Sequence, residues 1–135
     1  MPGIDLLDPT VYNPSQFGQL GTVSRVDSKI VFQVDDAFGG WFGGSFATVD
    51  SSSNPTLLLR LRVTNFAGNQ PIDVDLKLEQ QNVGSQAHTI KVFSSDWMTV
   101  EVPLNQDINV LIIEHLPANA ELEIDRLLLS EQAIV

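Results

Sequence analysis

The strictest pattern in the sequence is Ile72-Asp73-Val74-Asp75-Leu76-Lys77-Leu78-Glu79. Apolar and charged side chains alternate at every position, so in an extended chain all the apolar ones point to one side. A helix, with its period of about 3.6 residues, would mix the two sets on each face. The stretch therefore predicts a β-strand with one buried face and one face in water.

The same alternation recurs along most of the chain. In residues 56–64, Leu57, Leu59, Leu61 and Val63 alternate with Leu58, Arg60, Arg62 and Thr64. Further strand patterns fall in residues 22–34, 45–49, 89–93, 98–104, 110–113 and 122–129. Short clusters rich in Asn, Gly, Ser and Pro separate them, as in antiparallel sheets, and no segment has a convincing helical period. We expect an all-β fold, a two-sheet antiparallel β-sandwich of about eight strands.

The domain boundaries follow from composition. The first twenty residues contain Pro2, Pro9 and Pro14 and no clear alternation, which predicts an extended arm or linker over residues 1–20. Residues 21–135 then form a single β-sandwich domain, a size that buries a core without disulfides or metals. Cysteine is absent from the sequence, so thiolate chemistry is excluded.

Charge and hydropathy limit the classes of partner that the protein can bind. Seventeen acidic and seven basic residues give a net charge of −10, which disfavours binding to nucleic acid. No window is long and apolar enough for membrane insertion, and the first residues do not resemble a signal peptide. The compartment stays unknown; it is extracellular if the chain is a domain of a longer secreted enzyme.

A family resemblance lies in the last third of the chain. The resemblance rests on three stretches: Trp97-Met98-Thr99-Val100-Glu101-Val102-Pro103-Leu104, Asn109-Val110-Leu111-Ile112-Ile113 and Leu122-Glu123-Ile124-Asp125-Arg126-Leu127-Leu128-Leu129. These resemble the closing strands of carbohydrate-binding modules with the galactose-binding-like jelly-roll fold. The resemblance implies a jelly-roll, a polysaccharide or oligosaccharide partner, a tethered catalytic domain and, in many such modules, a structural Ca²⁺.

The glycine-rich segment Phe38-Gly39-Gly40-Trp41-Phe42-Gly43-Gly44 is the first candidate binding site. Paired glycines allow positive φ and would present Trp41 and Phe42 from a loop. An exposed indole face stacks on the apolar face of a sugar ring. The alternative is that both rings plug the end of the sandwich. Trp97 is expected in the core or at a sheet edge.

A polar sheet face with Arg60, Arg62, Asp75 and Lys77 is the second candidate glycan site. Cross-strand charge pairing would explain the same residues without a ligand. For Ca²⁺, the candidates are Asp27 and Asp125, with Asp35, Asp36 and Asp50 as further oxygen donors. Carboxylates in turns more often cap the backbone, and the spacing of an EF-hand is absent.

Catalysis has no support in the sequence. His88 and His115 are the two histidines, and neither lies in a recognisable catalytic motif. The leading hypothesis is a non-catalytic carbohydrate-binding module that uses loop aromatics and a polar sheet face. The alternative is a structural β-sandwich, such as a virion decoration, adaptor or surface-complex component, whose arm reaches a neighbouring subunit in a homo-oligomer.

Overall fold

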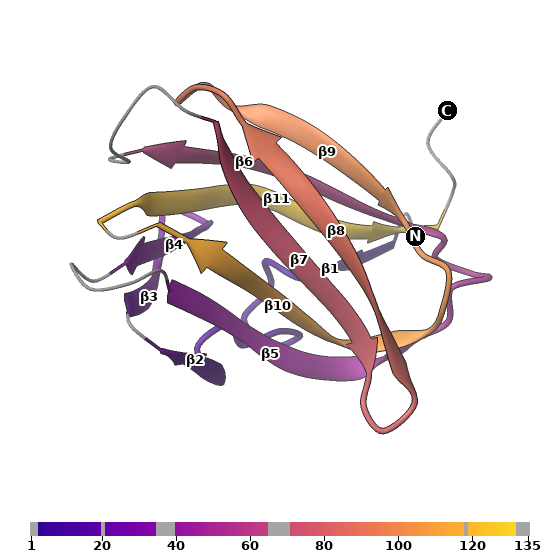
Figure 1. Cartoon of the computed structure of the whole chain (residues 1–135). Coiled ribbons are helices and arrows are strands. Elements are labelled where there is room, and N and C mark those ends of the chain that lie inside the picture. Colours follow the sequence, from indigo (N-terminus) through magenta and orange to yellow (C-terminus); the bar gives the residue numbers. More distant parts are fainter. Residues whose placement is uncertain (1–2, 20, 35–39, 65–70, 118, 132–135) are drawn as a thin grey trace.

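A computed structural model describes residues 3–19, 21–34, 40–64, 71–117 and 119–131 of the protein. Two antiparallel sheets pack face to face (Figure 1), and the described residues contain no helix, so none that could cross a membrane. The first sheet has six strands, in the order β3-β4-β11-β6-β9 with β1 also on β11: β1 (Gly3–Asp5), β3 (Gly21–Val26), β4 (Lys29–Val34), β6 (Thr56–Thr64), β9 (Met98–Pro103) and β11 (Glu121–Ser130). The second has five, in the order β2-β5-β10-β7-β8: β2 (Phe17–Gln19), β5 (Gly40–Val49), β7 (Ile72–Gln80), β8 (Gly84–Val92) and β10 (Ile108–Leu116). This confirms the predicted all-β, two-sheet sandwich.

The described residues form eleven strands, whereas the sequence predicted about eight. Residues 22–34 form a hairpin of two strands, β3 and β4, and the remaining two extra strands are β1 and β2. The hairpin turn is tight because Asp27 and Ser28 both have positive φ, 51° and 66°. Such a turn needs only two residues, so the sequence shows no gap between the strands.

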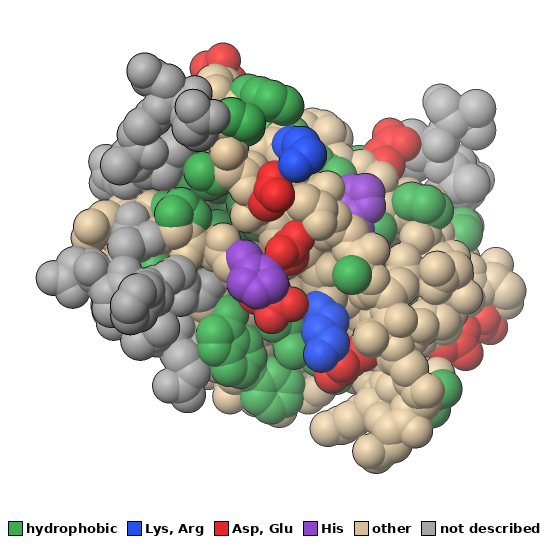
Figure 2. Space-filling view, in the orientation of Figure 1, with side chains coloured by type: hydrophobic (Ala, Val, Ile, Leu, Met, Phe, Trp, Pro, Cys, Tyr) green, Lys and Arg blue, Asp and Glu red, His purple; other side chains and the backbone are tan. Residues whose placement is uncertain are grey.

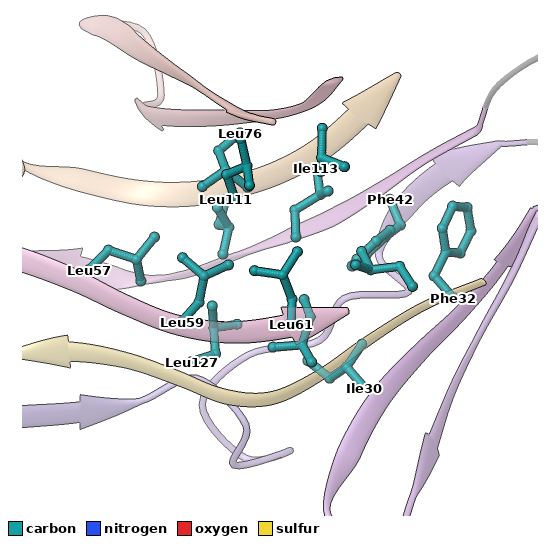
Figure 3. Close-up of a cluster of buried hydrophobic side chains, with 14 of the residues drawn as sticks. Ile30, Phe32, Phe42, Leu57, Leu59, Leu61, Leu76, Leu111, Ile113 and Leu127 are labelled. Atoms are coloured by element: carbon teal, nitrogen blue, oxygen red, sulfur yellow. The ribbon is translucent and has the colours of Figure 1, made fainter. Parts of the chain in front are cut away.

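The core lies between the sheets and consists of the alternating apolar side chains. In β7 the side chains of Val74, Leu76 and Leu78 are buried, and in β6 every second residue from Leu57 to Val63 is buried. Figure 3 shows the two sets facing each other, Leu57, Leu59, Leu61 and Leu127 from the six-stranded sheet opposite Leu76, Leu111 and Ile113 from the five-stranded one. The period-two pattern therefore identified the buried face of both strands.

The segment 1–20 was predicted as an arm or linker, but its described residues, 3–19, contribute to both sheets and to the core. β1 pairs with β11, and β2 pairs with β5. Between them, Leu6 and Tyr12 are buried, and the Tyr12 hydroxyl donates a hydrogen bond of 2.9 Å to the Leu111 carbonyl. Burial also raises the pKa of the Tyr12 hydroxyl well above its usual range. The described part of this segment is thus built into the sandwich.

Replacing Tyr12 with phenylalanine is expected to lower the free energy of unfolding by about 1–2 kcal/mol, since the buried Leu111 carbonyl would lose its hydroxyl donor. Urea unfolding followed by tryptophan fluorescence measures the change. Unchanged stability would mean that this segment does not dock through Tyr12.

Candidate functional site

Residues 40–44 of the glycine-rich segment belong to strand β5 and not to a loop, which corrects the sequence prediction for that part. Residues 35–39, including Phe38, lie outside the described residues. Gly43 and Gly44 do not have positive φ. A Cβ on Gly43 would lie 2.4 Å from the Leu111 oxygen, and one on Gly44 would lie 2.0 Å from the Asn13 oxygen. Glycine is needed here because neighbouring backbone approaches closely.

Trp41 and Phe42 point to opposite sides of β5, as neighbouring residues of a strand must. Phe42 is fully buried in the core, and its ring centroid lies 4.7 Å from that of Phe32. Phe42 is therefore not the exposed loop aromatic that the sequence predicted, and it cannot stack on a sugar at the outer surface. Trp41 is half-buried on the outer side of the five-stranded sheet.

A β-bulge in β10 lies beside Trp41. Ile113 pairs with Phe42 and Leu116 pairs with Gly40, so Glu114 and His115 together oppose Trp41. Among the described non-glycine residues with positive φ, His115, at 66°, is the one that lies inside a strand. The bulge lets two consecutive side chains leave the core side of β10. Bulges and positive φ at non-glycine residues are enriched at binding sites.

The His115 side chain reaches across to β7. Its Nδ1 lies 2.5 Å from Asp75 Oδ2, and the Thr89 hydroxyl of β8 donates a hydrogen bond of 2.5 Å to Asp75 Oδ1. These two contacts, Thr89 first, hold the pKa of Asp75 below its usual value. Asp75 is thus a fixed carboxylate, and the His115 ring, with two thirds of the side chain exposed, is oriented by it.

These residues form one row across the sheet, and we call the surface around it the outer face. The strand pairings place Trp41, Glu114, Asp75 and Thr89 side by side on β5, β10, β7 and β8. Four strands spaced by about 4.8 Å give the row a length of about 14 Å. Figure 2 shows that acidic, basic and histidine side chains gather across this face, over β10, β7 and β8.

Two ion pairs flank the row on the same face. Lys77 lies 3.6 Å from Glu79 within β7, and Lys91 of β8 lies 2.8 Å from Asp73. The structure thus brings Asp75 and Lys77 together with Trp41. Sequence reasoning missed Thr89 and dismissed His115 as lacking a catalytic motif. The available signal was the pair Glu114-His115, which interrupts the apolar pattern of β10.

Arg60 and Arg62 lie on the opposite side of the molecule, because β6 belongs to the six-stranded sheet. The prediction that they share a face with Asp75 and Lys77 is therefore wrong. Both guanidinium groups lie over the Trp97 ring, at 4.5 Å and 4.8 Å from its centroid. Trp97 is half-exposed on this outward side and is not a core residue. The Trp97 ring is therefore already occupied by cation–π contacts with the two arginines.

Glu123 is a buried carboxylate of the six-stranded sheet and lies beside Arg62. It accepts hydrogen bonds from Arg62 Nε at 2.7 Å and from Lys29 Nζ at 2.8 Å. The bond from Arg62, and then that from Lys29, lowers the pKa of Glu123. The unfolded chain has the ordinary glutamate pKa of about 4.3, so above this pH the ionised Glu123 stabilises the folded state. This contribution is lost as the pH falls through the lower pKa that Glu123 has in the folded state.

We therefore expect Glu123→Gln to lower the free energy of unfolding by about 1–2 kcal/mol at neutral pH, with the difference from the parent chain vanishing under acid conditions. Urea unfolding at a series of pH values measures it. Glu101→Gln is the matched control, because Glu101 is exposed and has no ion pair within the described residues. Parallel pH profiles for parent and Glu123→Gln would contradict the prediction.

Those residues proposed for Ca²⁺ that the structure describes do not form a site. Asp27 is exposed in the β3–β4 turn, and Asp125 bonds Arg60 through one oxygen. Asp50 accepts hydrogen bonds from Ser52, and Asp35 and Asp36 lie outside the described residues. Across the described ranges, no three His, Cys, Asp or Glu side chains are grouped to hold a metal ion. The described donors Asp27, Asp50 and Asp125 therefore do not fit a common Ca²⁺ ion.

Comparisons with known proteins identify the fold. No family model matches the chain, and no curated protein sequence matches it. Solved structures of family 29 carbohydrate-binding modules do match. One is 13% identical and covers 91% of this chain and 80% of its own, with a TM-score of 0.67. A variant complexed with mannohexaose is 12% identical and covers 97% and 86%, with a TM-score of 0.69. Another, with cellulohexaose, is 13% identical and covers 91% and 82%, with a TM-score of 0.68. The chain therefore has the jelly-roll fold of carbohydrate-binding modules, as the resemblance in its C-terminal third predicted.

Proposed function

We propose that the chain is a non-catalytic carbohydrate-binding domain that holds a linear polysaccharide on the outer face. The observation that carries the proposal is the row formed by Trp41 and the bonded group of His115, Asp75 and Thr89. An aromatic ring beside oriented polar groups is the combination that sugar recognition requires. The modules of the same fold that were solved with mannohexaose and cellulohexaose support it.

The row has a hydrogen-bonding group for a sugar at nearly every strand. The carboxylate of Asp75 has about four acceptor positions, of which Thr89 and His115 occupy two. The second ring nitrogen of His115 and the ammonium of Lys77 remain for hydroxyl groups. Because Asp75 already fixes the His115 ring, little side-chain freedom would be lost on binding.

The charge on the outer face selects among polysaccharides. Asp73, Asp75, Glu79 and Glu114 outnumber Lys77 and Lys91 there, and the whole chain carries a net charge of −10. This field repels anionic chains. We therefore propose an uncharged polysaccharide as the ligand. A tethered catalytic domain, as in the modules that the sequence resembles, remains part of the proposal.

Isothermal titration with mannohexaose and cellulohexaose, and affinity gels with neutral polysaccharides and with anionic polygalacturonate, test the function. We expect binding to at least one neutral ligand and weaker retardation by polygalacturonate. Repeating the titration with added Ca²⁺ and with a chelator is expected to give the same affinity. Absence of binding to every polysaccharide, with and without Ca²⁺, would contradict the proposal.

The assembly alternative rested on an N-terminal arm that reaches a neighbouring subunit. The described part of this segment pairs with the sheets of its own chain, which removes the main reason for that hypothesis. Static light scattering still separates the two. A defined homo-oligomer without affinity for any sugar would favour protein–protein assembly over the proposed function.

A further inference from the structure

A small pocket opens where an edge of one sheet meets an edge of the other. Its volume is about 230 Å³, and it is lined by residues of β2 and β5 on one side and of β3 and β4 on the other. Four of its lining residues are aromatic: Phe17, Phe32, Trp41 and Phe42. Neither the sandwich core nor the outer face requires this space to be open.

The size of the pocket matches one ring. A buried cavity of about 150 Å³ lined by apolar side chains is large enough for benzene. The space exists because Gly21 has no side chain, and a Cβ there would lie 2.5 Å from the Phe32 ring. Any other residue would push against the pocket wall.

The chemistry of the walls defines the ligand class. Aromatic rings favour offset or edge-to-face contact with another ring. No charged side chain is among the described lining residues, so a charged ligand would lose hydration without compensation. Ser15 and Thr22, both exposed, also line the pocket, and their hydroxyls have no hydrogen-bond partner within the described part of the chain.

We propose that this pocket binds a single uncharged aromatic ring that carries one hydrogen-bonding substituent. The ring packs against Phe17 and Trp41, and Ser15 or Thr22 bonds the substituent. This site shares Trp41 with the proposed sugar row, but the proposal does not depend on carbohydrate binding. Trp41 lines the pocket and also borders the outer face, so its indole reports on the pocket directly.

The test is an NMR titration of the ¹⁵N-labelled chain with phenol, which fits the proposed class. We expect the Trp41 indole and the amides of residues 21–23 to shift, with a millimolar dissociation constant. The Trp97 indole, on the other side of the molecule, serves as the internal reference. Benzoate, a charged ring of similar size, is expected to bind at least about tenfold more weakly.

Two serine variants localise the site. Ser15→Phe places a ring at the pocket and is expected to weaken phenol binding about tenfold, since the added ring competes for the same space. Ser24→Phe, at an exposed serine of β3 outside the pocket lining, is the matched control and should bind like the parent chain. Phe17→Ala removes one wall and is expected to weaken binding about fivefold.

Three outcomes would overturn the proposal. The first is the absence of shifts at Trp41 and at residues 21–23 over a titration that saturates a millimolar site. The second is equal affinity for benzoate and phenol. The third is equal phenol binding by the Ser15→Phe and Ser24→Phe variants. None of them bears on sugar binding, which the hexasaccharide titrations test separately.

Discussion

Replacing Trp41 with alanine is expected to weaken hexasaccharide binding at least about tenfold, the largest functional effect of any single substitution. The Trp41 indole lies beside the row of His115, Asp75 and Thr89. Its removal takes away the stacking surface and leaves only hydrogen bonds that water also provides. Isothermal titration with the hexasaccharide that binds the parent chain measures the loss.

Trp97→Ala is the matched control, because it removes the same side chain from the other side of the sandwich. Trp97 contacts Arg60 and Arg62, so the substitution is expected to lower stability while leaving sugar affinity unchanged. If Trp97→Ala lost affinity and Trp41→Ala retained it, the binding surface would be the six-stranded sheet. If both variants bound the hexasaccharide as tightly as the parent chain, the proposed site would not use an aromatic ring.

Phe42→Ala is expected to have the largest effect on stability, about 3–5 kcal/mol of the free energy of unfolding. The ring is fully buried and packs against Phe32, so alanine leaves a cavity between the sheets. Urea unfolding measures the loss. Phe42→Leu, which refills much of the volume, serves as a milder variant and is expected to cost about 1–2 kcal/mol.

Sugar affinity distinguishes this effect from a binding defect. Titrated below its unfolding transition, the Phe42→Leu variant is expected to bind the hexasaccharide like the parent chain. A loss of affinity in a folded Phe42 variant would contradict the assignment of this ring to the core. Trp41 and Phe42 are adjacent in sequence, so together they separate the two faces of one strand.

The sequence predicts the fold well because alternation depends only on the two faces of a strand. In β7, Val74, Leu76 and Leu78 are buried as expected, and in β6 so are Leu57, Leu59, Leu61 and Val63, although Thr56 and Leu58 are buried there as well. The pattern cannot say which sheet a strand joins. Consecutive strands β6 and β7 lie in different sheets, so Arg60 and Asp75 point to opposite sides of the molecule although their patterns look alike.

The candidate site was less predictable because it depends on contacts distant in sequence. Gly43 and Gly44 resemble a turn, but neighbouring backbone packed against β5 requires them. The position of His115 depends on a bulge in β10, whose register is set by its pairing with β5 and β7. The N-terminal segment shows no alternation of apolar and polar residues, because it joins the sandwich only through two three-residue strands and isolated buried residues such as Tyr12.

The pairing of β1 with β11 determines how the domain would respond to tension in a longer chain. Gly3 lies directly opposite Ser130 in an antiparallel ladder, so the two chain ends leave the sandwich side by side. Pulling them apart would load the hydrogen bonds of this ladder one after another, because they run perpendicular to the strands. β1 is three residues long and would peel away first, followed by the buried Leu6. The join between the first and last strands is therefore the mechanical weak point of the fold.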